Sequence, residues 1–186
     1  MSTASFKVSF NLDSDDAAYF RQRFRAARKL AGSETPDAIL AASRSLVQNV
    51  RRAHKTPQFV LTAVASLEDL IQIIEDEDYA APRSIVNQVL GALAYFANPH
   101  DMIPDDVPVL GFLDDAIMIK LVEQEFKHEL AAYRKFRRFR RGAEQRPWTQ
   151  VASGRLPRRL AEQRAKLREE VDRRKQIDRD KGLPSF

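Results

Sequence analysis

The chain has 186 residues, a formal net charge of +5 and no cysteine. Its hydrophobic fraction of 44% is too high for a disordered polymer, and its length suits one domain with a sizeable core. The lack of cysteine excludes disulfides and thiolate zinc sites and fits a reducing cytosol. The N-terminal letters MSTASFKVSFNL do not read as a signal peptide, so we expect a cytoplasmic protein that is not exported.

Apolar residues recur three and four positions apart along most of the chain, which predicts an all-α protein, a bundle of five or six helices. Only residues 6–12 alternate in twos, which predicts a short extended N-terminal arm. A first helix is expected from about residue 13 to residue 32, with Phe20 and Phe24 facing inward and a basic outer face. A second and a third helix each follow a Thr-Pro pair, in which threonine caps the helix and proline takes its first position.

The third helix, from residue 57 to about residue 78, has so many apolar residues that we expect it to be buried on more than one side. A fourth helix is expected over residues 82–97 and ends at an Asn-Pro pair. A fifth begins near Phe112 and continues past Tyr133, and a sixth covers about residues 158–181. The longest uncharged run, residues 84–100, contains too many polar residues to predict a membrane span.

These elements suggest two regions. Residues 1–141 are expected to form the helical bundle, including a hairpin at about residues 82–122. Residues 142–186 form a basic C-terminal loop and helix that packs on the bundle or projects from it. The expected last helix has a narrow apolar stripe, formed by Leu156, Leu160, Leu167 and Val171. This stripe is sufficient for the helix to dock on the bundle or on another subunit.

Charge is strongly segregated along the chain. Residues 68–129 contain fourteen acidic and three basic residues, whereas residues 134–181 contain eighteen basic and seven acidic residues. The basic region predicts an anion-binding surface, for a nucleic acid or an anionic membrane. The residues that would form this surface are Arg134, Arg137, Arg138, Arg140 and Arg141. The sequence favours the other interpretation, a solvated or docked helix, because acid-first pairs four residues apart neutralise part of the charge.

The aromatic residues in this basic region also favour packing within the protein over binding to a nucleic acid. Tyr133, Phe136 and Phe139 lie three apart, so on a helix they share a face. Such a stripe could stack on bases, but it more often packs into a core. We therefore expect core packing, and nucleic acid is the less favoured partner.

The acidic segment from residue 98 to residue 115 allows two interpretations. In the structural one, its aspartates cap turns and helix ends, and Asp114 and Asp115 occupy the first turn of the fifth helix, where the helix dipole favours negative charge. In the other, Asp101, Asp105, Asp114 and Asp115 converge on a divalent cation, Mg²⁺ or Ca²⁺. The structural interpretation requires no cofactor.

Catalysis has little support in the sequence. The chain contains no P-loop, dinucleotide-binding glycine motif, nucleophile elbow or HExxH motif. Asp114 and Asp115 could act as an acid–base pair, but adjacent helical residues point about 100° apart. The sequence thus favours a non-catalytic binding or interaction module over a metal-dependent enzyme.

Residues 92–119, ALAYFANPHDMIPDDVPVLGFLDDAIMI, resemble the hallmark of the YkvA-like family, a bacterial domain of unknown function. The acidic residues that match are the four aspartates named above; the others are Tyr95, Phe96, Pro99, Ile103, Pro104, Pro108 and Gly111. Relatives with a more apolar hairpin are often predicted to be membrane-associated. The resemblance implies no activity, and it leaves three partners open: another protein, a second copy of the chain, or an anionic membrane surface that the chain contacts peripherally.

Overall fold

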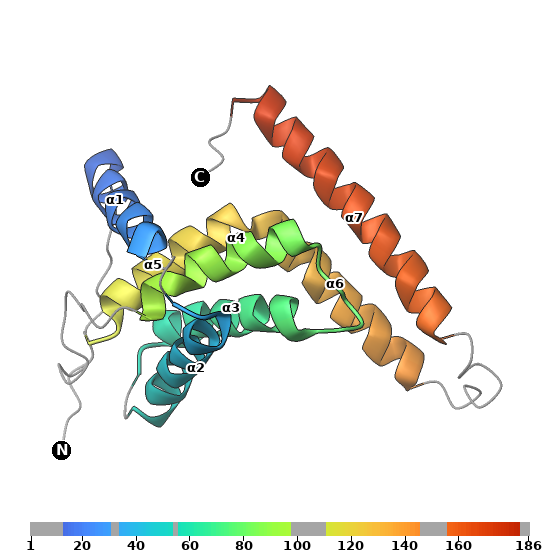
Figure 1. Cartoon of the computed structure of the whole chain (residues 1–186), viewed down its shortest axis with the longest axis horizontal. Helices are drawn as coiled ribbons and strands as arrows, with labels where there is room; N and C mark the ends of the chain where they lie inside the picture. Colours follow the sequence, from blue (N-terminus) through green and yellow to red (C-terminus); the bar gives the residue numbers. More distant parts are fainter. Residues whose placement is uncertain (1–12, 31–33, 54–55, 98–110, 146–155, 183–186) are drawn as a thin grey trace, which may run out of the picture.

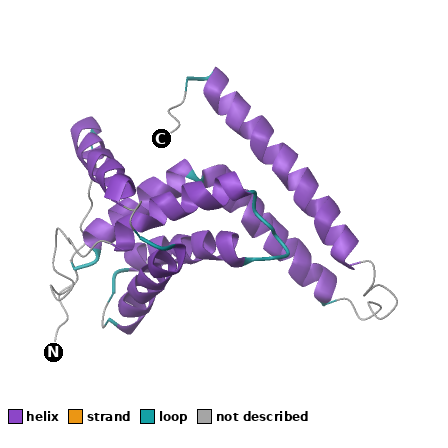
Figure 2. Cartoon of the chain, in the orientation of Figure 1, coloured by secondary structure: helices purple, strands orange, loops and turns teal. Residues whose placement is uncertain are grey.

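The computed structural model describes residues 13–30, 34–53, 56–97, 111–145 and 156–182. These residues form seven α-helices and one short 3₁₀ helix, η2, and contain no strand (Figure 1, Figure 2). The elements are α1 (Ser14–Leu30), α2 (Pro36–Arg52), α3 (Gln58–Glu75), α4 (Arg83–Leu93), η2 (Ala94–Ala97), α5 (Leu113–Glu125), α6 (Lys127–Glu144) and α7 (Leu156–Asp180). The all-α class is confirmed, with more helices than expected, while the extended arm predicted at residues 6–12 lies outside the described residues.

Threonine residues act differently at the starts of α2 and α3. At α2, the Thr35 hydroxyl oxygen accepts a hydrogen bond from the Ala38 amide at 3.2 Å, as an N-cap should. At α3, the prediction of a capping threonine is wrong. Thr56 instead donates its hydroxyl to the carbonyl oxygens of Val50 and Ala53, at 3.0 and 3.1 Å, and thereby ties the end of α2 to the connection that follows it.

α3 lies at the centre of the bundle and packs against α2, α4, α5 and α6. Its buried apolar residues are Val60, Ala63, Val64, Leu67, Leu70, Ile71 and Ile73. They cover more than one side of the helix, as the sequence predicts. Phe59 differs from this pattern, because it remains 46% exposed at the start of α3.

The fifth predicted helix is two helices. The chain leaves regular α geometry at the buried residue Phe126, where φ is −98° and ψ is 18°. α5 therefore ends at Glu125 and α6 begins at Lys127. No proline or glycine marks this position, so the prediction of one continuous helix is wrong for a reason that local sequence does not reveal.

α7 packs along α6, and the two helices are drawn side by side in Figure 1. The predicted apolar stripe of α7 forms this contact: Leu160, Leu167 and Val171 are buried in the core cluster, and Leu156 packs at its edge. The stripe therefore docks within the chain. The boundary drawn at residue 141 falls inside α6, which continues to Glu144, and the division into two regions stays a prediction.

Candidate binding surfaces

The hallmark segment is described only at its two ends. Tyr95 and Phe96 lie in η2, where their rings meet edge to face with centroids 5.2 Å apart. Gly111 is buried immediately before α5. The hallmark prolines Pro99, Pro104 and Pro108 and the predicted ligands Asp101 and Asp105 lie outside the described residues, so their predicted roles stay predictions.

Asp114 and Asp115 occupy the first turn of α5, where the structural interpretation places them. Both side chains are largely removed from solvent, with exposed fractions of 3% and 8%. The residue that caps α5 is Phe112, which offers no side-chain cap, so negative charge in the first turn compensates the helix dipole. Among the described residues, no three histidine, aspartate or glutamate side chains are grouped as metal ligands. The Mg²⁺ or Ca²⁺ site that would also need Asp101 and Asp105 stays a prediction.

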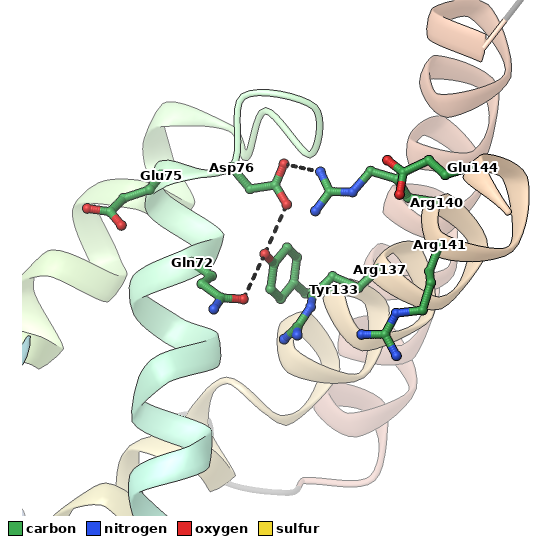
Figure 3. Close-up of a pocket in the computed structure, with 8 residues that line it drawn as sticks. All are labelled: Gln72, Glu75, Asp76, Tyr133, Arg137, Arg140, Arg141 and Glu144. Atoms are coloured by element: carbon green, nitrogen blue, oxygen red, sulfur yellow. Dashed lines mark hydrogen bonds and ion pairs between the residues drawn. The ribbon is translucent and has the colours of Figure 1, made fainter. Parts of the chain in front are cut away.

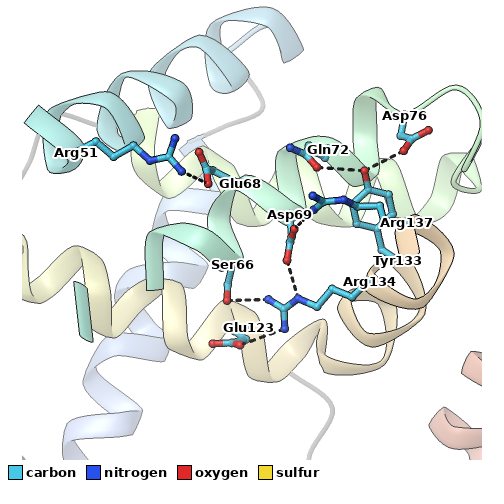
Figure 4. Close-up of polar contacts among 10 residues, drawn as sticks. All are labelled: Arg51, Ser66, Glu68, Asp69, Gln72, Asp76, Glu123, Tyr133, Arg134 and Arg137. Atoms are coloured by element: carbon cyan, nitrogen blue, oxygen red, sulfur yellow. Dashed lines mark hydrogen bonds and ion pairs between the residues drawn. The ribbon is translucent and has the colours of Figure 1, made fainter. Parts of the chain in front are cut away.

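Most of the arginines predicted to bind anions instead bind acidic residues of α3. Arg134 and Arg137 both donate to the Asp69 carboxylate at 2.6 Å, and Arg134 also reaches Ser66 Oγ at 3.1 Å (Figure 4). Arg140 donates to Asp76, the C-cap residue of α3, at 2.8 Å. We call this contact the α3–α6 seam. It brings the acidic and basic halves of the sequence together inside one chain.

Asp76 is the most buried acid of the α3–α6 seam. Burial acts to raise its pKa, but hydrogen bonds from Arg140, from the Tyr79 amide and from the Tyr133 hydroxyl outweigh it, so the pKa lies below its ordinary value of 3.8. The same arrangement raises the pKa of Tyr133, first by burial and then by its hydrogen bond to Asp76. The Asp76 carboxylate is therefore held in its charged form.

The lowered pKa of Asp76 predicts a pH dependence of stability. A carboxyl group with a lower pKa in the folded state stabilises the protein fully above the unfolded pKa, near 3.8, and this contribution is lost as the pH falls through the folded value. We expect Asp76→Asn to be less stable than the wild type at neutral pH, and the difference to shrink as the pH falls below 3.8. Urea unfolding across this range measures it, and a difference that is constant with pH would contradict this role of Asp76.

Basic residues of α7 neutralise a fully buried acid on α6. Glu129 has no exposed surface, and its carboxylate accepts hydrogen bonds from Arg168 Nη1 at 2.8 Å and from Lys175 Nζ at 2.9 Å. The Arg168 guanidinium also lies over the ring of Tyr79. Burial and the neighbouring Glu129 charge raise the pKa of Tyr79 to about 12, so this phenol stays neutral. We call Glu129, Arg168 and Lys175 the α7 clamp.

Further ion pairs join α6 to α7. Lys135 donates to Glu170 at 2.7 Å, and Asp178 accepts from Lys127 at 2.5 Å and from His128 at 2.8 Å. Within α7, Arg174 forms the expected pair with Glu170 at 2.6 Å. Much of the basic C-terminal charge is thus neutralised inside the chain. The predicted anion-binding residues Arg138 and Arg141 are the exposed exceptions on α6.

The basic face of α1 contrasts with that of α6. The exposed residues Arg23, Arg25 and Lys29 form no ion pair or hydrogen bond with the rest of the chain as far as it is described. Phe24 of the same helix is buried, and α1 packs against η2 and α4. The sequence carries a signal for this surface: residues 17–33 include five basic residues and no acidic residue. The sequence therefore predicts a basic outer face on the first helix, but it indicates the more basic C-terminal region as the candidate for anion binding.

A polar pocket of about 440 Å³ opens between α3 and α6 (Figure 3). From α3 and its C-cap it is lined by Gln72, Glu75 and Asp76, and from α6 by Tyr133, Arg137, Arg140, Arg141 and Glu144. The pocket lies at one end of the α3–α6 seam, so two of its arginines are already oriented by carboxylates. Sequence periodicity gave no sign of it, because its walls come from helices about sixty residues apart.

Comparison with known proteins identifies relatives of the central segment. A family model described as a protein of unknown function (DUF1232) matches residues 88–121. The chain is 34% identical over 100 residues to a Bacillus subtilis (strain 168) protein named uncharacterized membrane protein YkvA, and the match covers 52% of this chain and 89% of that protein. No solved structure matches the chain. Within the described residues, every helix is too short or too polar to cross a membrane.

Proposed function

This chain belongs to the YkvA-like family. We propose that it is a non-catalytic binding module that docks peripherally on an anionic membrane surface through α1. The observation that carries the proposal is the exposed basic face of α1, where Arg23, Arg25 and Lys29 have no acidic partner among the described residues. Arg25 and Lys29 are four residues apart and lie on one side of the exposed surface of α1, whereas Arg23 flanks Phe24 on the other side. Unneutralised cations around the exposed surface of a helix attract anionic lipid headgroups at close range.

The position of α1 also supports the proposal. Its apolar side is already buried against η2 and α4, so its outward side can contact lipid headgroups while the bundle stays folded. η2 contains residues from the start of the hallmark segment, so α1 itself packs beside the part of the chain that defines the family. The name of the Bacillus relative, an uncharacterized membrane protein, agrees with an association of this kind.

Many cations of the basic C-terminal region are already bound within the chain, although Arg138, Arg141, Lys166 and Arg173 have no partner among the described residues. The cations at positions 134, 137, 140, 168 and 175 are bound to carboxylates of α3 or α6. A paired cation must give up its partner before it can neutralise a lipid phosphate, and this reduces the gain. Cations without such partners attract the membrane at no such cost.

Binding to lipid vesicles tests the proposal. We expect the protein to sediment with vesicles that contain phosphatidylglycerol and not with vesicles of pure phosphatidylcholine. High salt should release the protein from the anionic vesicles. Each basic residue near an anionic leaflet contributes about 1 kcal/mol. The triple variant Arg23→Gln, Arg25→Gln, Lys29→Gln should therefore bind roughly 100-fold more weakly.

A second triple variant gives a control with the same change in charge. Arg138→Gln, Lys166→Gln and Arg173→Gln remove three exposed cations of α6 and α7 that have no partner in the described residues, and this variant should bind nearly as well as the wild type. Equal losses in the two variants would show that only net charge matters, and would contradict docking by α1. Duplex DNA at the same ionic strength should bind more weakly than the vesicles, and tighter binding to DNA would also contradict the proposal.

A further inference from the structure

We propose that the pocket between α3 and α6 binds the phosphate group of a small phosphomonoester, held by Arg137, Arg141 and Gln72. This site is separate from the basic face of α1 and does not depend on membrane binding. It also narrows the anion-binding surface predicted from the sequence, since two of the five predicted arginines supply the contacts.

Two guanidinium groups lie at one end of the pocket. Arg137 and Arg141 are four residues apart on α6, and Figure 3 draws their guanidinium groups on the same side of the pocket, away from Glu144. Arg137 is fixed by Asp69, which binds only its Nη1 atom among the contacts of the described residues, and by the ring of Tyr133, 5.7 Å from its guanidinium carbon. Arg141 makes no ion pair with a described residue, so its charge is available to a ligand.

Gln72 supplies a third donor from the opposite wall. The Tyr133 hydroxyl donates to Asp76 at 2.9 Å and lies 3.4 Å from Gln72 Oε1, which places the amide oxygen on the tyrosine side. The donor end of the amide, Nε2, makes no hydrogen bond to the described residues and can face a ligand. Donors thus come from both α3 and α6.

The acidic residues around the pocket are mostly neutralised by other cations. Asp76 is bound by Arg140, and Glu75 is bound by Arg44 of α2. Asp69 holds two arginines with one carboxylate, which leaves positive charge on the side of the pocket where Arg137 lies. Glu144 is the one lining acid with no cation partner among the described residues, and Figure 3 places it toward Arg140 and away from Arg141.

The geometry favours phosphate over a carboxylate. A planar carboxylate offers two oxygens in one plane, whereas a phosphate presents oxygens around a tetrahedron and can accept from donors on both walls. The volume of about 440 Å³ is larger than a phosphate group needs and lies in the range of small-molecule sites. The polar lining favours a hydrophilic remainder, such as a sugar. These features together define the ligand class as small sugar phosphates.

Calorimetric titration of the full-length protein with ribose 5-phosphate, in a buffer without phosphate and at constant ionic strength, tests the site. We expect saturable binding with a Kd of about 1 mM or tighter, weaker binding of inorganic phosphate, and none of ribose. Arg141→Gln should weaken binding at least tenfold without lowering the melting temperature, because Arg141 is exposed. Arg138→Gln, on the same helix but outside the pocket, is the matched control and should bind normally.

Nuclear magnetic resonance locates the ligand independently of the variants. The side-chain amide signals of Gln72 should shift with the same saturation curve as the calorimetric heat. The proposal is overturned if ribose 5-phosphate binds no better than ribose, if Arg138→Gln weakens binding as much as Arg141→Gln, or if the Gln72 amide signals do not move. Tighter binding of succinate than of any phosphate would show that the site takes a carboxylate and would reject the phosphate assignment.

Discussion

Replacing both Arg168 and Lys175 with methionine is expected to lower the free energy of unfolding by about 3–5 kcal/mol. The double variant leaves Glu129 fully buried with neither of its cations. A buried carboxylate that loses its partners retains the cost of desolvation and loses the attraction that offset it. Urea unfolding followed by circular dichroism measures the change, and hydrogen exchange of the α7 amides shows whether α7 leaves the bundle first.

A third substitution separates the buried charge from simple loss of contacts. Adding Glu129→Leu to the double variant removes the uncompensated charge and fills the site with apolar atoms, so most of the lost stability should return. A triple variant as unstable as the double variant would show that the α7 clamp contributes through packing alone. That result would contradict the electrostatic account of how α7 is attached.

Phe136→Ala is expected to cost about 3–5 kcal/mol of stability. Phe136 is fully buried on α6, and its ring lies 5.3 Å from that of Tyr79. Truncation would leave a cavity where α3, α6 and the connection after α3 meet, and a rigid helical core closes such a cavity only in part. Chemical denaturation measures the loss.

Phe59→Ala is the control for this second prediction. Phe59 is 46% exposed at the start of α3, so its truncation should change stability by less than about 0.5 kcal/mol. Equal effects at the two positions would contradict the assignment of Phe136 to the core. They would also revive the interpretation in which the aromatic residues of α6 are exposed for stacking on bases.

Helix positions could be predicted from the sequence wherever a segment with apolar periodicity was bounded by a capping residue, a proline or a glycine. Thr35 and Pro36 mark the start of α2, and the apolar residues of α3 indicate its central position. The break at Phe126 could not be predicted, because no glycine, proline or polar cluster accompanies it. The exposure of Phe59 also depends on tertiary packing, which local periodicity does not contain.

The candidate sites were less predictable than the fold. The C-terminal arginines look available in the sequence because their partners, such as Asp69 and Asp76, lie more than sixty residues away. Only the fold shows that α3 neutralises them, and that Arg23, Arg25 and Lys29 have no such partners in the described chain. Local charge counts describe a segment in isolation, whereas the charge available to a ligand depends on contacts between distant segments.

The orientation of the protein on a membrane tests docking through α1 directly. Because the chain has no cysteine, a polarity-sensitive fluorophore can be attached through Ala26→Cys on α1 or through Ala165→Cys on α7, both at exposed positions. On vesicles that contain phosphatidylglycerol, we predict a blue shift for the label on α1 and little change for the label on α7. A blue shift confined to the α7 label, or no shift from either label when the protein is bound, would contradict docking through α1.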